Sequence, residues 1–473
     1  MKAQPFYLGG EWKESQEVIE IKNPFNGKIV SKVCQAQSQD ILFAVQTAHN
    51  IFPKLKSLSS FEKACILKNI VKGLLEEKET LAKSITQEMG KPLKESLNEV
   101  LRALNTFEIA AEEVTRFGGE WIPLDTTPTS LDRVGLSKRF PVGVVCGITP
   151  FNYPLNLASH KIAPALAVGN PLILKPPLQC PTSSLLLAKI IENSGLPKEA
   201  FSVLPCSNEL AEALAFHQNI KLISFTGSAH VGWYLKQKAQ KQKVILELGG
   251  VANLVVDEDA DLNDVVKRCL MGAFTNAGQS CISTQRIYVH HRIYKKFLEL
   301  FIPQVQKLKM GNPLNLKTDL GPLVTQKAAE RVEEWVNEAV KKGAKLLCGG
   351  KRKKTFYEPT VLTGVKENMK ISCEEIFGPV CFVNSFTHFD DVLKTVNNTP
   401  FGLQAGLYTQ DIQKIWKAYE VLDVGGLVVG DTPTFRLDHM PYGGIKDSGV
   451  GREGLKYAME EMTEPKLLVL RKQ

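Results

Sequence analysis

The sequence predicts an α/β protein with two doubly wound units and an extended arm. Three observations indicate this fold. Short apolar runs alternate with helical segments between residues 143 and 248, a second alternation begins near Val251, and the segment 119–141 has no helical period. Buried strands that alternate with helices are typical of parallel sheets, whose ligands bind beyond the carboxyl ends of the strands. A chain of 473 residues has room for about two to four such units.

Helices are predicted first, from about residue 59 to 117. Ser59 and Glu62 have the spacing of a capping box, and Gly90 and Pro92 interrupt the helical pattern. The second part predicts a helix of about five to six turns. The apolar faces comprise Cys65, Leu67, Ile70, Val71, Leu74 and Leu75 before the interruption, and Leu97, Val100, Leu101, Leu104, Ala111 and Val114 after it.

Strands are predicted from the apolar runs. In the first unit they cover 144–148, 172–174, 201–204, 222–225 and 244–248, and in the second they lie around 287–289, 380–386, 405–408 and 426–429. Residues that carry chemistry should therefore follow these runs directly. Three such positions stand out, namely 149–152, 175–176 and 226–228.

Composition narrows the function classes. The net charge of +8 is spread over 58 basic and 50 acidic residues, so nucleic-acid binding is not implied. Hydrophobic residues make up 44% and charged residues 23%, which predicts a soluble protein without membrane spans. No signal-peptide pattern is present, so a cytoplasmic location is expected. Ten scattered cysteines, none in a Cys-x-x-Cys pair, predict reduced thiols and no structural metal.

Cys281 is the sharpest site candidate, because a glycine-containing loop after an amphipathic helix exposes it at a defined place. An isolated cysteine is more often an inert buried thiol. Glu247 ends an apolar strand before a Gly-Gly turn and has the place of a general base, although a surface glutamate at a strand end is an equal alternative. Asn152, between two prolines, has an amide suited to an oxyanion, but such an asparagine commonly only makes a turn.

A cofactor signal lies where Ser224–Ser228 runs from a strand into a helix. Backbone N–H groups and the Ser228 hydroxyl at a helix N-terminus suit a pyrophosphate. Gly227 and Gly232 do not match the Gly-x-Gly-x-x-Gly fingerprint, so this motif alone is weak.

Together these motifs resemble the aldehyde dehydrogenase superfamily over nearly the whole chain, within its lactaldehyde, non-phosphorylating glyceraldehyde-3-phosphate and succinate-semialdehyde branch. The motifs keep the order and approximate spacing of that family. They are Pro150-Phe151-Asn152, Lys175-Pro176, Phe225-Thr226-Gly227-Ser228, Glu247-Leu248-Gly249-Gly250, Gly278-Gln279-Ser280-Cys281, Glu375-Ile376-Phe377-Gly378-Pro379, Pro441-Tyr442-Gly443-Gly444, Lys446, Ser448-Gly449 and Gly451-Arg452-Glu453.

The resemblance implies that Cys281 is the nucleophile, Glu247 the general base and Asn152 the oxyanion donor. It implies NAD or NADP as cofactor, with Lys175 on the adenosine ribose, Ser228 on the pyrophosphate and Glu375 on the nicotinamide ribose. Further cofactor contacts are expected from Thr149, Phe151, Leu178, Gly227 and Phe377. Lys161 matches a family lysine near the site, without a defined role.

The resemblance also implies a domain plan. Residues 1–118 and 142–250 are expected to form the dinucleotide-binding domain, and 251–445 the catalytic domain. Segments 119–141 and 446–473 are expected to form an oligomerisation arm and C-terminal segment, which predicts a homodimer or homotetramer. The arm would satisfy an open sheet edge of a neighbouring copy.

Two departures from the family pattern leave cofactor and substrate open. Leu178 stands where NAD-preferring members often carry a glutamate, so NADP is possible. Asp431-Thr432 stands where an asparagine is commoner, in a loop that shapes the aldehyde pocket. Arg102, Tyr153 and Arg436 are substrate candidates, and the two arginines favour a short acidic or hydroxylated aldehyde. Solvent-facing arginines are the alternative.

Two functions from other classes compete with aldehyde oxidation. A cysteine hydrolase would pair Cys281 with a histidine, but none of the eight histidines lies in a recognisable partner motif. A non-catalytic structural homologue would be expected to lose at least one of Cys281, Glu247 and Asn152, and all three are present.

Overall fold

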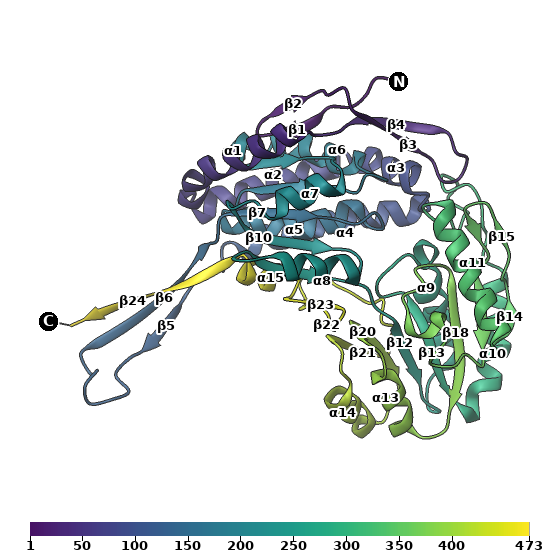
Figure 1. Ribbon diagram of the computed structural model, residues 1–473. Coiled ribbons are helices and arrows are strands. Elements are labelled where there is room, and N and C mark those ends of the chain that lie inside the picture. The colour runs from purple at the N-terminus through teal and green to yellow at the C-terminus, as the bar shows by residue number, and fades with distance from the viewer. Residues whose placement is uncertain (473) are drawn as a thin grey trace.

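Two packed units and a projecting arm make up the molecule. The computed structural model describes residues 1–472. The N-terminal half of the chain forms most of one unit, residues from about 252 to 446 form the other, and the C-terminus lies on the arm (Figure 1). The predicted α/β class is therefore confirmed.

The first unit contains an eight-stranded sheet in the order β2-β1-β9-β8-β7-β10-β11-β23. Its central strands β9, β8, β7, β10 and β11 are parallel, and their order reverses direction between β7 and β10. Such a reversal in a doubly wound sheet opens a ligand crevice beyond the strand ends. The strands are β1 (Phe6–Leu8), β2 (Glu11–Lys13), β7 (Val144–Ile148), β8 (Leu172–Lys175), β9 (Phe201–Val203), β10 (Ile220–Thr226), β11 (Lys243–Glu247) and β23 (Gly449–Val450).

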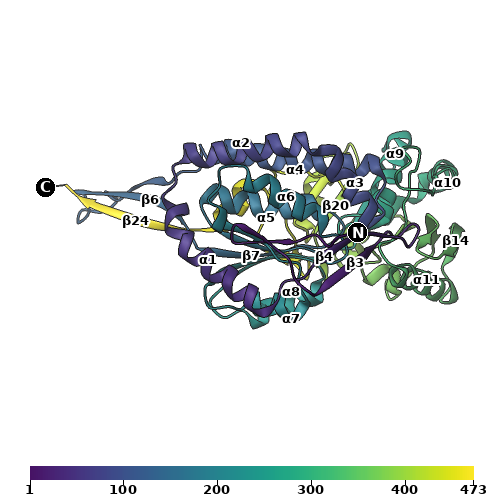
Figure 2. The same ribbon diagram turned by 90° about the horizontal axis from the view of Figure 1, so that it is seen from above.

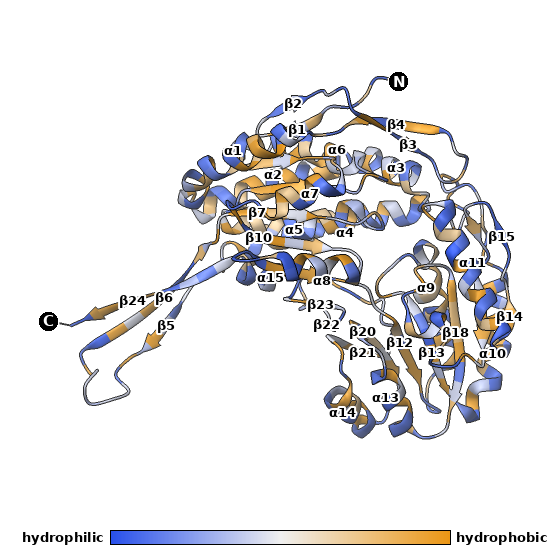
Figure 3. Cartoon of the chain, in the orientation of Figure 1, coloured by the Kyte–Doolittle hydropathy of each residue, from blue (hydrophilic) through white to orange (hydrophobic). Residues whose placement is uncertain are grey.

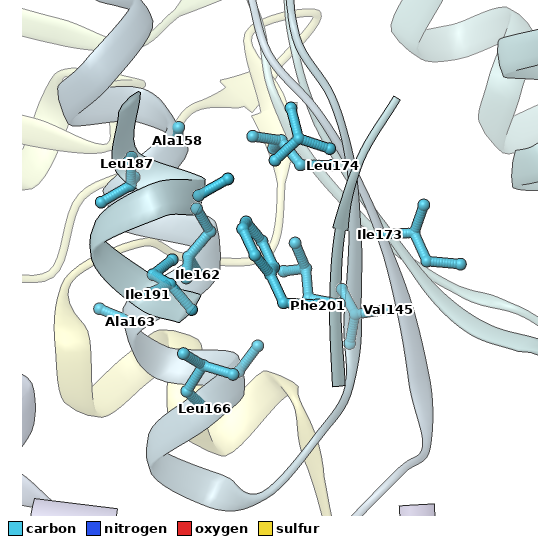
Figure 4. Packing of buried hydrophobic residues seen from close by; sticks show 14 of the residues in the cluster. Val145, Ala158, Ile162, Ala163, Leu166, Ile173, Leu174, Leu187, Ile191 and Phe201 are labelled. Carbon is cyan, nitrogen blue, oxygen red and sulfur yellow. The ribbon is translucent and has the colours of Figure 1, made fainter. Parts of the chain in front are cut away.

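Helix α5 (Pro154–Val168) forms the centre of this core, and all of its residues are buried. Pro154 suits the first helical position, and Gly169 ends the helix in the left-handed conformation with φ 88°. Figure 4 shows α5 and α6 (Thr182–Glu192) packed against the sheet through Ala158, Ile162, Ala163, Leu166, Leu187 and Ile191 on the helices and Val145, Leu174 and Phe201 on the strands. The fixed start of α5 is important for the site, because only its N-cap residue Tyr153 separates the helix from Asn152.

The predicted N-terminal helices are α2 (Ser60–Glu76), α3 (Lys78–Met89) and α4 (Leu93–Glu113), preceded by α1 (Ser38–Ser57). The Ser59–Glu62 capping box is confirmed, and Gly90 ends α3 as expected. Three details of the prediction were wrong: the first stretch breaks at Glu77, and Leu75 and Leu101 are 59% and 44% exposed. Helix α2 packs on α4, and α4 packs on α5. Leu75 on α2 and Leu101 on α4 lie outside the areas covered by these contacts.

The second unit contains a seven-stranded sheet in the order β14-β17-β18-β13-β12-β20-β21, parallel except for β14. The four predicted strands are present, and β12, β14 and β17 were not predicted. Asn253 interrupts the apolar run of β12, where its amide donates to Val251 O, and β14 is a largely exposed edge strand. The strands are β12 (Ala252–Val256), β13 (Thr284–His290), β14 (Lys345–Cys348), β17 (Thr360–Thr363), β18 (Val380–Phe386), β20 (Gln404–Tyr408) and β21 (Gly426–Val429).

Further helices and short strand pairs complete the two units. The helices of the second unit are α9 (Leu262–Phe274), α10 (His291–Gln306), α11 (Gln326–Lys341), α12 (Lys370–Cys373), α13 (Phe389–Asn397) and α14 (Ile412–Val421). The remaining helices are α7 (Asn208–Ala215), α8 (Ala229–Lys238) and α15 (Leu455–Glu461). Two-stranded pairs are β3 (Val18–Lys22) with β4 (Ile29–Cys34), β15 (Arg352–Lys353) with β16 (Phe356–Tyr357), and β19 (Phe401–Gly402) with β22 (Ile445–Lys446).

The arm is a three-stranded antiparallel sheet of β5 (Glu120–Pro123), β6 (Arg133–Pro141) and β24 (Thr463–Arg471), in the order β24-β6-β5. It extends away from both units (Figure 2). Apolar residues on it are exposed, among them Trp121 and Leu467–Leu470. Figure 3 shows segments of the arm in the orange of hydrophobic residues. Within residues 1–472, none of the helices combines the length and apolar character that crossing a membrane requires.

Candidate active site

The loop that carries Cys281 has an unusual backbone. After α9, Asn276, Ala277 and Gly278 follow one another with φ values of 52°, 53° and 68°. Gly278 is required here, because a Cβ atom would lie 2.0 Å from the carbonyl oxygen of Gly378. Left-handed conformations at residues with side chains cost about 1 to 3 kcal/mol each and persist only where the surroundings hold them. The loop is thus held in a shape that its own sequence does not favour.

Cys281 lies at the end of this loop, partly exposed, and packs against Ile282, Leu403 and Tyr442. Its Sγ is 3.4 Å from the hydroxyl oxygen of Tyr442. Burial raises the pKa of the thiol to about 11, the Tyr442 hydroxyl lowers it, and the Glu375 carboxylate raises it further. In this form the thiol is protonated at neutral pH, so attack by sulfur requires a proton acceptor.

Asn152 follows β7 and is buried against the same loop. Its Nδ2 donates to the carbonyl oxygen of Gln279 at 3.2 Å, and Asn276 Nδ2 donates to the carbonyl oxygen of Asn152 at 3.2 Å. These reciprocal contacts join a segment of the first unit to the nucleophile loop of the second. An amide nitrogen carries two hydrogens, so Nδ2 retains one for a further acceptor.

Glu247 is the last residue of β11 and is buried. Neither carboxylate oxygen has a hydrogen-bond partner among residues 1–472. Oε1 lies against Gly443, where a Cβ atom would be 2.9 Å away. Burial raises the pKa of Glu247 well above its ordinary value, and Glu453 raises it further, while Arg436 and Lys161 act in the opposite direction. A carboxylate with a raised pKa is a stronger base than an ordinary glutamate, which suits general-base chemistry.

A buried charged cluster lies behind Glu247. Lys161 Nζ donates to Thr226 Oγ1 at 2.7 Å and is 3.5 Å from Glu453 Oε1. Arg436 Nη2 is 2.9 Å from Glu453 Oε2 and 2.7 Å from His160 Nδ1. Although burial favours the protonated carboxyl, Lys161 and His160 hold the pKa of Glu453 well below its usual range. The sequence supplied Glu453 only as part of a motif, and it gave no signal for His160.

A cavity of about 300 Å³ joins the substrate candidates to the nucleophile. Arg102 Nη2 is 2.8 Å from Asp438 Oδ1, and its side chain is 27% exposed. Arg436 is 7% exposed, and its guanidinium carbon lies 3.6 Å from the centre of the Tyr442 ring. Neither arginine is simply solvent-facing. The cavity is lined by Cys281, Asn152, Arg102, Tyr153, Arg436 and Tyr442, together with the polar residues Asn98, Asn156 and Thr434.

The predicted cofactor residues of the first unit lie at the carboxyl ends of β7, β8 and β10. The backbone N–H of Thr149 donates to Lys175 O at 3.2 Å, and Thr149 Oγ1 is buried without a partner in the described part of the chain. Burial lowers the pKa of Lys175. Ser228 caps α8, directly after Gly227. A buried free hydroxyl, a lysine and a helix N-terminus suit the sugar and phosphate groups of a dinucleotide.

Residues of the second unit contact this part of the first unit. Glu375 Oε1 accepts the N–H of Gly250 at 3.2 Å. Gly249 lies beside it, and a Cβ atom at this position would be 2.6 Å from Glu375 Oε2. The rings of Phe151 and Phe377 meet edge to face with their centres 5.8 Å apart. These contacts bring sequence-predicted cofactor residues from both units together, and Leu178 is half-buried after Lys175.

Comparison with known proteins identifies relatives over nearly the full length. Residues 12–468 match the model of the aldehyde dehydrogenase family. The 3-sulfolactaldehyde dehydrogenase of Priestia megaterium is 43% identical over 99% of this chain and 98% of its own. The structure of aldehyde dehydrogenase 21 from Physcomitrella patens, in complex with the reaction product succinate, has a TM-score of 0.98 and 42% identity, covering 100% and 98% of the two chains. Glyceraldehyde-3-phosphate dehydrogenase GapN from Methanocaldococcus jannaschii, complexed with NADP, has a TM-score of 0.93 and 40% identity, covering 97% and 100%.

Proposed function

The chain belongs to the aldehyde dehydrogenase family and is an NAD(P)-dependent aldehyde dehydrogenase, and we propose that its substrate is a short aldehyde with an anionic or hydroxylated tail. The supporting observation is Arg102, a partly exposed guanidinium in the wall of the cavity that also contains Cys281. The relatives act on or bind compounds of this kind, as their names state: 3-sulfolactaldehyde, lactaldehyde and succinate.

In the proposed reaction, the partly exposed Cys281 thiol releases its proton to solvent water, and the resulting thiolate attacks the aldehyde carbon. The Asn152 amide and the Cys281 backbone N–H donate to the oxyanion of the resulting thiohemiacetal, since two fixed donors stabilise developing charge without reorganisation. NAD(P)⁺, when bound, supplies the hydride acceptor. Loss of hydride from the thiohemiacetal carbon leaves a thioester on Cys281, and Glu247 then takes a proton from the water that hydrolyses it.

The dinucleotide is proposed to be held by the residues at the strand ends and by Glu375 and Phe377, described above. Lys175 would contact the adenosine ribose, and Ser228 with the N-terminus of α8 would contact the pyrophosphate. Glu375 would contact the nicotinamide ribose, between the Gly249 turn and Phe377. The alternative of a cysteine hydrolase would need a histidine imidazole next to Cys281 to activate the thiol. The side chain within hydrogen-bonding distance of Cys281 Sγ is instead Tyr442, through its hydroxyl.

The cavity supports the substrate class by its size and by the polar groups near Arg102, although Leu157, Met271, Ile282 and Phe435 make other parts of its wall apolar. Its volume of about 300 Å³ is at the low end for small-molecule sites. Asn98, Asn156 and Thr434 supply hydrogen-bonding groups beside Arg102. Both arginines already donate from Nη2 to a carboxylate, Arg102 to Asp438 and Arg436 to Glu453. Arg436 is less suited to a substrate anion, because it is only 7% exposed whereas Arg102 is 27% exposed. Arg102 is therefore the residue to test.

The aldehydes to test are succinate semialdehyde, glyceraldehyde 3-phosphate and lactaldehyde. Arg102→Ala should lower kcat/KM about 10- to 100-fold more for an anionic aldehyde than for propanal, because a charge-assisted bond contributes about 1.5–3 kcal/mol. Steady-state NADPH formation with each aldehyde measures this. Arg116→Ala, an exposed arginine just beyond α4, is the matched control. Equal losses on propanal and the acidic aldehydes would refute an acidic-tail substrate, as would better activity of the unchanged enzyme on long alkyl aldehydes.

Leu178→Glu should shift cofactor preference toward NAD⁺. A carboxylate at this position can bond the adenosine 2′-hydroxyl, and it repels a 2′-phosphate. The measurement is the ratio of kcat/KM for NADP⁺ to that for NAD⁺, with Leu178→Gln as the neutral control of similar size. An unchanged ratio in the glutamate variant would assign the preference to other residues.

A homodimer or homotetramer is proposed through the arm. β24 pairs with β6 along its length, and its residues from Glu464 to Arg471 are exposed. The run Leu467–Leu470 is therefore apolar surface that a second copy would cover. The division into a dinucleotide-binding domain, a catalytic domain and an arm with a C-terminal segment is proposed with the boundaries expected from the sequence, except that β23 pairs with β11 and is assigned to the first unit.

A further inference from the structure

Three charged residues at four-residue intervals line one side of α4 and its start, namely Lys91, Glu95 and Glu99. None of them lines the cavity that contains Cys281. Lys91 and Glu99 are buried, and Glu95 is half-buried. Charged groups are buried only where they have partners that compensate for lost hydration. The partners of these three residues lie in the two segments that carry Asn152 and Cys281.

Glu99 fastens α4 to the oxyanion segment. Its Oε1 accepts the backbone N–H groups of Leu155 and Asn156 at 2.9 and 3.2 Å, in the first turn of α5. Lys91 pairs with the other oxygen, and its Nζ lies 3.7 Å from the centre of the Tyr153 ring. Negative charge at a helix N-terminus also favours the helix dipole. Helix α4 is thereby fixed relative to the residues that directly follow Asn152.

Glu95 reaches from the same helix to the nucleophile loop. Its Oε2 accepts the backbone N–H of Asn276 at 2.7 Å. Asn276 begins the left-handed run that precedes Cys281, with φ 52°. This contact therefore holds the loop at the residue where its unfavourable backbone conformation starts.

We propose that Glu95 is a positioning residue that sets the distance between Cys281 and the Asn152 oxyanion donor. The two groups come from different units, and α4 contacts the segments of both through Glu99 and Glu95. Without the Glu95 acceptor, the Asn276 N–H loses its partner and the loop relaxes toward ordinary backbone conformations. A displacement of about 1 Å in a reacting group is enough to lower a rate about 100-fold. The inference rests on the proposed nucleophilic role of Cys281.

Three variants of the full-length protein test this: Glu95→Ala, Glu95→Gln and the control Glu108→Ala, which changes an exposed glutamate of the same helix. The measurements are kcat and KM with propanal and with an acidic aldehyde, NADPH affinity by fluorescence titration, and Tm. Glu95→Ala should lower kcat about 10- to 100-fold, equally on both aldehydes, because the loop and not the substrate tail is affected.

Glu95→Gln should recover most of this loss, since its amide oxygen still accepts from the Asn276 N–H. NADPH affinity should stay within about twofold in all variants, because the substitution changes the nucleophile loop alone. A larger change in affinity would indicate damage to the whole fold. The inference is overturned by a kcat of Glu95→Ala close to that of Glu108→Ala, by a glutamine variant as slow as the alanine variant, or by loss of NADPH binding. A loss confined to acidic aldehydes would also overturn it. Failure of the nucleophile assignment is seen separately, as activity retained in Cys281→Ala.

Discussion

Replacing Cys281 with alanine or serine should abolish aldehyde oxidation while NADPH still binds. Only a thiolate combines high nucleophilicity with a thioester that water can hydrolyse. Loss of a covalent nucleophile costs about 10⁴-fold or more in kcat. The fold should tolerate the change, because Cys281 is partly exposed and packs at the edge of a small cluster with Ile282, Leu403 and Tyr442.

The measurement is NADPH formation at saturating NADP⁺, together with fluorescence titration of NADPH binding. Cys65→Ser is the matched control, because Cys65 is a partly exposed cysteine on α2 outside the cavity. It should keep full activity. Turnover by Cys281→Ala at more than a trace of the parent rate would remove the thioester from the reaction, and lost NADPH binding would attribute the defect to the fold.

Glu247→Gln should convert steady turnover into a single burst. The first hydride transfer yields one NADPH per active site, and the thioester then accumulates because no base activates water. Removing a general base slows the step by roughly 10²- to 10⁴-fold. Rapid mixing with NADP⁺ and aldehyde, followed by mass spectrometry of the intact protein, should show the burst and the acyl adduct on Cys281.

The pH dependence separates a base from a structural carboxyl. Burial, followed by the nearby Glu453, raises the pKa of Glu247. The active base is the deprotonated form, so deacylation in the parent should accelerate as pH rises through this elevated pKa and then level off. In Glu247→Gln this rise should disappear, while Glu108→Gln should retain it. An unchanged steady-state rate and pH profile in Glu247→Gln would assign the base to another group.

Much of the fold was predictable because its signals are local. The runs that form β7, β18 and β21 coincide with the observed strands, and the Ser59 capping box is present. Periodicity failed where neighbours decide exposure. Leu75 and Leu101 continue apolar stripes in sequence, yet both are exposed, because the helices packed against them cover a narrower band. β12 was missed since Asn253 interrupts its run and is satisfied by a carbonyl nearby.

The sequence by itself determined which residue types stand at strand ends and loops: Cys281, Glu247 and Asn152 as chemical candidates, and Lys175, Ser228 and Glu375 as cofactor candidates. Only the tertiary structure decided their surroundings. Tyr442 lies 161 positions from the cysteine that it contacts, and Glu95 lies 181 positions from Asn276. Helical and strand periods describe which face of an element is apolar, whereas contacts between two sheets depend on how those faces pack. Burial at those contacts raises the pKa values of Cys281 and Glu247. This burial cannot be predicted from the local sequence around either residue.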